Sequence, residues 1–227
     1  MSSESPVRTA RARRFRLREP FSGLSHLGGA LLGIAALVVL VTLARGKPWH
    51  ESGFAIYGAT LIVLYLASAL YHLLPVGAHH IERLRTFDHI GIYLLIAGTY
   101  TPICLVPLRG GWGWSLFGVV WGLALFGSVT EVAWRTAPRW LGLVLYMVMG
   151  WLAVIVFRPL AHVLPAAALG WLVAGGLVYT LGAVVFALER PRLWPGIFGA
   201  HDLWHLFVLG GSACHFVLML RFVVPFP

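Results

Sequence analysis

The sequence predicts an all-α fold, a seven-transmembrane-helix bundle, from its composition and from the spacing of its apolar residues. Apolar residues make up 59% of the chain and charged residues only 11%, whereas soluble domains carry roughly 25% charged residues. The mean hydropathy is +0.83. The apolar residues gather in seven runs, each close to the roughly 20 residues that a helix needs to cross a bilayer. These observations together indicate an integral membrane protein.

Each run ends at a polar connector that carries Pro, Gly or charged residues, the usual signals of a turn. In order, the connectors are "RGKPWHESG", "PVGAHHIERLRT", "PLRGGWG", "EVAWRTAPR", "RPLAHVLP" and "ERPRLWPGIFG". A basic arm, residues 1–20, precedes a transmembrane domain of residues 21–227. The predicted spans are Leu24–Leu43, Phe54–Leu74, Phe87–Leu105, Trp114–Val132, Trp140–Phe157, Ala166–Leu188 and Ala200–Val223.

Small residues suggest how these spans pack. Glycines four positions apart, Gly29 with Gly33 and Gly118 with Gly122, predict close helix approach. The two cysteines fall inside apolar runs, where they are expected to act as small core residues rather than as a disulfide or a thiol metal site.

The basic residues predict the orientation of the bundle. If the N-terminus is cytoplasmic, the inner segments hold twelve Lys and Arg residues and the outer segments hold five. Because cytoplasmic segments are enriched in Lys and Arg, we expect the N-terminus inside and the C-terminus outside. Although the net charge is +9, the expected partner of the arm is an anionic membrane surface and not nucleic acid. The arm arginines are Arg8, Arg11, Arg13, Arg14, Arg16 and Arg18.

On this map, several polar residues fall at one membrane depth, near the cytoplasmic side. His72 lies in the last turn of the second span, with Ser68 one turn deeper. His201 and His205 occupy the first two turns of the seventh span, four positions apart, so both imidazoles project from the same helix face. Three neutral imidazoles form the ligand set of an open zinc site. Asp88, at the start of the third span, could orient a water molecule or accept its proton.

Simpler interpretations explain the same residues. Asp88 and Asp202 could stabilise the positive N-termini of their helices, and interfacial histidines often face lipid headgroups. His26 is a candidate additional neighbour of the site. His215 lies too far along its helix to share a metal with His205, so a buried hydrogen bond is expected there. Spacing alone leaves these alternatives open.

Motifs that cover nearly the whole chain resemble the bacterial hemolysin III family, relatives of the progestin and adipoQ receptors. They are "SALYHLLP", "FDHIGIYLLIAGTYTP" and "HDLWHLF…ACHF". The resemblance implies seven helices with a cytoplasmic N-terminus in the bacterial inner membrane. It also implies zinc as the cofactor, bound by His72, His201 and His205, with Asp88 and Ser68 as the matching acid and hydroxyl. The long cytoplasmic domain of the animal receptors has no counterpart here, so hormone binding is not carried over.

Three functions follow from the residues and the resemblance. The first is a ceramidase-like zinc hydrolase of a lipid amide or ester, in which Asp88 takes a proton and Ser68 holds the water or the oxyanion. The second is a receptor-like regulator of membrane homeostasis in which zinc only ties helices together. The third is a pore-forming cytolysin, which the scarcity of polar residues in the outer halves of the spans disfavours. A membrane lipid is the expected partner in the first case.

Overall fold

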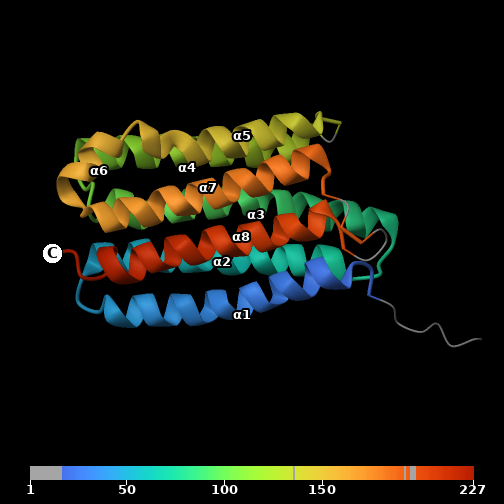
Figure 1. Cartoon of the computed structure of the whole chain (residues 1–227), viewed down its shortest axis with the longest axis horizontal. Coiled ribbons are helices and arrows are strands. Elements are labelled where there is room, and N and C mark those ends of the chain that lie inside the picture. The colour runs from blue at the N-terminus through green and yellow to red at the C-terminus, as the bar shows by residue number, and fades with distance from the viewer. Residues whose placement is uncertain (1–16, 135, 192, 195–197) are drawn as a thin grey trace, which may run out of the picture.

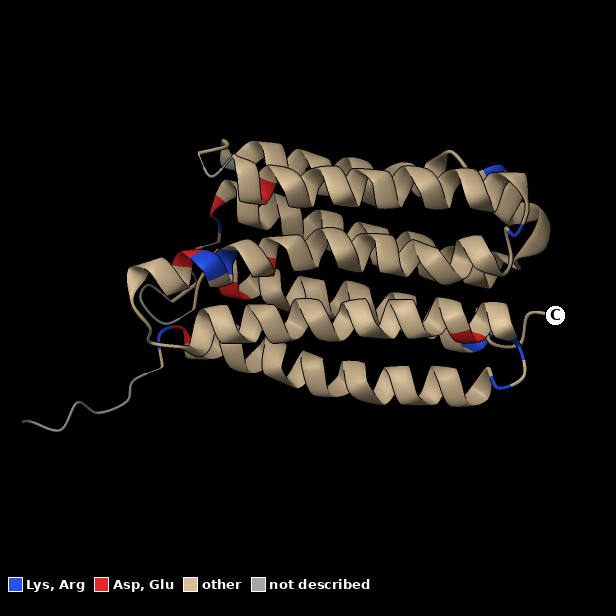
Figure 2. Cartoon of the chain, turned by 180° about the vertical axis from the view of Figure 1, so that it is seen from behind, with Lys and Arg blue, Asp and Glu red and all other residues tan. Residues whose placement is uncertain are grey.

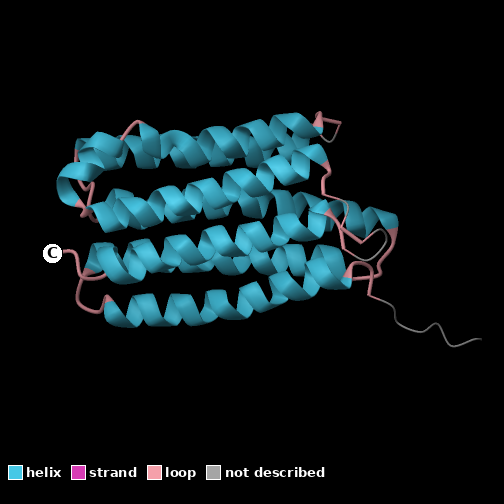
Figure 3. Cartoon of the chain, in the orientation of Figure 1, coloured by secondary structure: helices cyan, strands magenta, loops and turns pink. Residues whose placement is uncertain are grey.

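The computed structural model describes residues 17–134, 136–191, 193–194 and 198–227. Within these ranges the chain folds into helices, and the only β-type pairing is an isolated bridge between Trp194 and Phe198 (Figure 3). A 3₁₀ turn (Leu152–Val154) follows α5, and a π-helical turn (Met219–Val223) ends α8. The α-helices are α1 (Pro20–Leu43), α2 (Pro48–Leu73), α3 (Ala78–Leu105), α4 (Gly111–Ala133), α5 (Arg139–Trp151), α6 (Phe157–Val163), α7 (Ala166–Leu188) and α8 (Ala200–Leu218).

The long helices lie side by side along one axis (Figure 1). α2 packs against α1 and α3, α3 packs against α4, and α7 packs against α8. The start of α1 and the C-terminus lie at opposite ends of the bundle. Charged residues gather near these two ends and leave the middle of the bundle almost free of charge (Figure 2). This distribution fits a protein whose middle is surrounded by lipid.

Among the described residues, five helices are long and apolar enough to cross a membrane: α1, α2, α4, α7 and α8 with its π turn. α5 and α6 would together form a sixth span, bent by 45°. Large apolar side chains face outward, with Leu32 70% and Leu125 67% exposed, as expected for contact with lipid rather than water. The chain is therefore a multi-span membrane protein. α3 carries more polar residues and is not among the qualifying helices, so the predicted count of seven spans is not confirmed.

Several helices begin earlier than the apolar runs. α2 starts at Pro48 and α3 at Ala78, so parts of the predicted connectors "RGKPWHESG" and "PVGAHHIERLRT" are helical. Much of the connector "RPLAHVLP" likewise forms α6. Hydropathy marks only the segment that lies in lipid, whereas a helix can continue through polar residues into the interface. α7 matches its predicted bounds. Pro165 directly precedes its first residue, and Glu189, in the left-handed conformation, directly follows its last residue.

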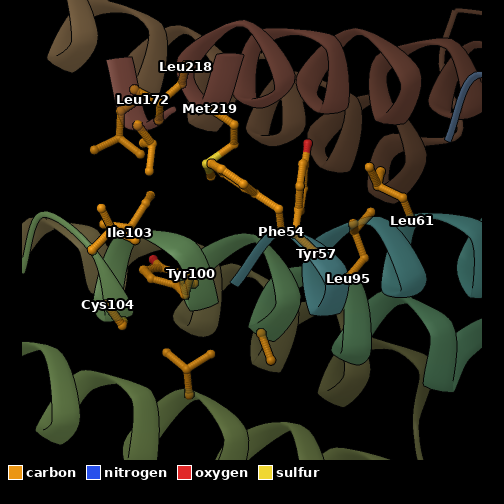
Figure 4. Close-up of a cluster of buried hydrophobic side chains, with 14 of the residues drawn as sticks. Phe54, Tyr57, Leu61, Leu95, Tyr100, Ile103, Cys104, Leu172, Leu218 and Met219 are labelled. Carbon is orange, nitrogen blue, oxygen red and sulfur yellow. The ribbon is translucent and has the colours of Figure 1, made fainter. Parts of the chain in front are cut away.

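The core lies between the helices and is rich in aromatic residues. Phe54 and Tyr57 of α2 are fully buried and lie near Met219 at the end of α8 (Figure 4). Both cysteines are free. Cys104 is buried, as expected for a core residue, whereas Cys214 is only partly buried. Glycines allow the closest approaches, since a Cβ atom added at Gly91 of α3 would lie 2.9 Å from the Cα atom of Leu64 in α2.

The two predicted glycine pairs differ. A Cβ atom at Gly29 would lie 2.7 Å from Leu209, and one at Gly33 would contact Ile62, so this pair does face neighbouring helices. The prediction for Gly118 and Gly122 was wrong, because a Cβ atom at either position would meet nothing within 4 Å. Sequence spacing reveals that two glycines share a helix face but not whether that face meets another helix.

Candidate metal centre

Three histidines meet at the end of the bundle where α2 ends and α8 begins. His72 lies in the last turn of α2, and His201 and His205 lie in the first two turns of α8. Their candidate ligand nitrogens all lie within 4.8 Å of one another. The ring centre of His72 is 5.1 Å from that of His201 and 4.6 Å from that of His205. The three predicted ligands therefore form one group that could hold a metal ion.

The hydrogen bonding of the two buried histidines leaves one nitrogen free on each ring. His72 and His205 are 1% and 3% exposed, while His201 is exposed. The Nε2 atoms of His72 and His205 have no hydrogen-bond partner among the described residues. A buried polar atom without a partner is costly and rare, and a metal ion would satisfy both atoms. The donor set, imidazoles without a thiolate, fits zinc.

The other ring nitrogen of each buried histidine is engaged. His72 Nδ1 donates to Oε2 of Glu19, the residue before α1. His205 Nδ1 lies 2.9 Å from Nε2 of His26 in α1. The hydrogen bond from His72 lowers the pKa of Glu19 to about 2, so this carboxylate is ionised at neutral pH. A histidine that donates one N–H to a carboxylate presents the other nitrogen as a lone pair, the usual arrangement of metal-binding histidines.

Asp88 and Ser68 lie beside this group. Asp88 of α3 is buried, at 9% exposure, and its carboxyl interacts with the His72 ring and the Ser68 hydroxyl. Ser68 is fully buried one turn before His72, and its Oγ makes no well-formed hydrogen bond within the described ranges. Asp88 is not a member of the group of candidate ligands. The structure thus brings a carboxyl and a hydroxyl next to the histidines, while their predicted roles stay predictions.

Asp202 has the helix-capping role that the simpler interpretation gave it. Its Oδ2 accepts a hydrogen bond from the backbone N–H of Gly199 at 3.0 Å, which satisfies a free donor at the start of α8. Its Oδ1 also accepts a hydrogen bond from Ser22 Oγ at 2.7 Å. Sequence reasoning missed Glu19 and Ser22. For Glu19, the signal in the sequence was its position as an acidic residue directly before the first apolar run.

The remaining histidines lie outside the group. His89 Nδ1 is 3.2 Å from Oε2 of Glu131 in α4, a contact between α3 and α4. His215 donates to the carbonyl of Gly211 at 2.9 Å, which confirms the expected buried hydrogen bond. His50 lies at the other end of the bundle and contacts the carbonyl of Phe226.

An apolar cavity of about 140 Å³ runs between α3, α5, α7 and α8. Residues along its length include Ile92, one turn beyond Asp88, and Trp204, next to His205. The cavity continues to Ile103 and Leu172, deeper in the bundle. The three candidate ligands and Asp88 are not among its lining residues, so the cavity lies in the apolar core, with Ile92 and Trp204 on the side of the histidine group.

A family model and several known proteins match this chain over most of its length. A family model described as Haemolysin-III related matches residues 15–216. Hemolysin-3 of Bacillus cereus is 38% identical over 220 residues, which cover 95% of this chain and 96% of that protein. The human monocyte to macrophage differentiation factor is 28% identical over 212 residues, covering 87% and 82%. The adiponectin receptor protein of Drosophila melanogaster is 27% identical over 216 residues, covering 85% of this chain and 48% of the receptor.

Proposed function

The chain belongs to the haemolysin III-related family, and from this premise we propose that it binds one zinc ion through His72, His201 and His205. The observation that supports this most directly is the pair of buried Nε2 atoms without partners, on rings whose Nδ1 atoms are already bonded. A shared metal ion accounts for both free nitrogens at once.

We propose that this site lies toward the cytoplasmic side of a bacterial inner membrane, in a bundle of seven spans. The five apolar helices, the bent pair α5–α6 and α3 would together make seven spans. The split of basic residues, twelve against five, supports a cytoplasmic N-terminus. The arm would add to this by binding anionic lipid headgroups, although residues 1–16 lie outside the described residues.

The reaction that best fits the residues is hydrolysis of a lipid amide or ester. Zinc, when bound, supplies Lewis-acid polarisation of a carbonyl group and a lowered pKa for water. Asp88 would accept the proton of the attacking water and return it to the leaving nitrogen or oxygen as that bond breaks. Ser68 would donate a hydrogen bond to the oxygen that gains charge. The apolar cavity, which Ile92 and Trp204 line within one turn of Asp88 and His205 in sequence, would hold the acyl chain of the substrate.

A second function is supported by the connections that the site makes. The candidate ligands come from α2 and α8, and their hydrogen bonds reach α1. Zinc bound there would tie three helices together without any turnover. In that case the protein would act as a regulator whose helix arrangement depends on zinc.

One experiment separates the two functions. Purified protein is assayed for metal content and incubated with a ceramide-like amide, a phospholipid ester and a membrane lipid extract, followed by mass spectrometry. The Asp88→Asn variant should keep its zinc and lose about 10²–10⁴-fold in turnover, the usual contribution of a positioned base. Glu131→Gln is the matched control, because Glu131 contacts His89 and not the histidine group. Zinc-loaded wild type that hydrolyses none of these lipids would favour the regulator.

A further inference from the structure

Three side chains at the start of α1 lie along one side of the helix and face the candidate metal centre. Glu19, Ser22 and His26 are three and seven positions apart, a spacing that places residues on one helix face. Ser22 and His26 are 1% and 3% exposed, whereas Glu19 is about half exposed. None of the three belongs to the group of candidate ligands found among the described residues.

Each of these residues bonds a different part of the site. Glu19 accepts from Nδ1 of His72, and His26 Nε2 lies 2.9 Å from Nδ1 of His205. Ser22 donates to Asp202 at 2.7 Å, and Asp202 is the residue that caps α8. One face of α1 therefore contacts both buried ligands and the first turn of the helix that carries two of the three.

The start of α1 is also held firmly in place. The backbone N–H of Glu19 donates to the carbonyl of His72 at 2.9 Å. The Arg18 guanidinium lies 4.5 Å from the ring centre of Tyr71 and pairs with Glu19 Oε1 at 3.2 Å. A Cβ atom at Gly23 would collide with Leu73 Cγ, so α1 and α2 approach closely here. The partners of the ligands are thus fixed by backbone contacts and by packing.

We propose that Glu19, Ser22 and His26 are positioning residues that set the zinc affinity of the site by fixing the ring orientation of His72 and His205 and the start of α8. This inference rests on the proposed zinc site. A carboxylate at Nδ1 selects the tautomer that leaves Nε2 free for the metal and raises the basicity of that nitrogen. Loss of such a partner typically weakens metal binding by about 10–100-fold.

The test measures zinc affinity of the full-length purified protein by competition with a chelator, for Glu19→Gln, Ser22→Ala and His26→Gln. Glu51→Gln and Ser25→Ala are matched controls. Glu51 bonds the backbone of Gly46 at the opposite end of α2, and the Ser25 hydroxyl bonds the carbonyl of Ser22 and not Asp202. We expect Glu19→Gln and His26→Gln each to weaken zinc binding by about 10–100-fold. Ser22→Ala should weaken binding less, because it acts only through Asp202, and the controls should stay within about twofold of wild type.

Cobalt substitution supplies a readout that a general loss of stability would not produce. The absorption spectrum of Co²⁺-loaded Glu19→Gln and His26→Gln should keep the band pattern of the wild type, because the ligand set is unchanged. A His26→Gln spectrum that changes as His205→Ala does would make His26 a ligand and overturn its positioning role. Because Glu19 is half exposed, Glu19→Gln is expected to fold even where a buried substitution at His26 does not, and it then decides the outcome.

The results distinguish failure of the positioning role from failure of the zinc site itself. Wild-type affinity in both Glu19→Gln and His26→Gln, with zinc still bound through the three histidines, would overturn the positioning role and leave the zinc site intact. Absence of zinc binding by the wild-type protein would refute the site, and the positioning role with it.

Discussion

The clearest test of the metal centre compares two buried histidines of α8. His205 and His215 are 3% and 7% exposed, and each makes a hydrogen bond through Nδ1. Replacing either one with alanine removes the same ring from a similarly buried position, so both variants should lose stability without zinc. Only His205 belongs to the group of candidate ligands. The two variants should therefore lose similar stability in the absence of zinc and differ only in how much zinc stabilises them.

The size of the difference follows from binding linkage. At free zinc of 100 times the dissociation constant, the metal stabilises the folded state by about 2.7 kcal/mol. For a chain of this size, about 1 kcal/mol shifts the unfolding temperature by about 2–4 °C, so zinc should raise the Tm of wild type by about 5–11 °C. His215→Ala should keep this increase. If His205→Ala weakens binding 100-fold or more, the same free zinc contributes no more than about 0.4 kcal/mol, a shift of about 2 °C or less.

The measurement is thermal unfolding in detergent, with free zinc buffered and with excess chelator, for wild type and both variants. Metal content of each sample is determined in parallel. The reasoning would be refuted if His205→Ala retained the full zinc-dependent increase in Tm, or if His215→Ala lost it. The first result would show that zinc binds elsewhere, and the second that the increase depends on the general integrity of α8.

Three further outcomes are expected. Cysteines introduced beside Arg109 and Arg158 should react with an impermeant reagent from outside the cell, and cytoplasmic labelling of both would overturn the proposed orientation. In a denaturation assay, Gly91→Ala should destabilise the protein by about 1–3 kcal/mol, because the added Cβ meets the α2 backbone at 2.9 Å. In the same assay Gly118→Ala should be neutral or slightly stabilising, because its added Cβ meets nothing within 4 Å. Tyr65→Phe removes a buried 2.6 Å hydrogen bond to α8 and should cost about 0.5–1.5 kcal/mol, with unchanged stability contradicting the bond.

Composition and local pattern were enough to predict the helical class, the positions of the apolar segments and the three histidines that meet. Span positions follow from hydropathy because the bilayer imposes a length on each apolar run. The histidines could be grouped because helix periodicity places His201 and His205 on one face, and because consecutive spans return to alternate ends of the bundle. His72 could be assigned to the same end by counting crossings.

Ser68, Asp88 and His26 were expected near those histidines, but only the tertiary structure showed which atoms the residues of α1 contact. Glu19 reaches His72 across 53 positions, and Ser22 and His26 reach α8 across 180 and 179. Such contacts depend on which helix packs beside which and on its rotation about its own axis, and hydropathy constrains neither strongly when lipid surrounds the bundle. The same limit explains why Gly29 and Gly118 looked alike in sequence but differ in packing. Local sequence determines the helices, whereas their rotation and neighbours determine the site.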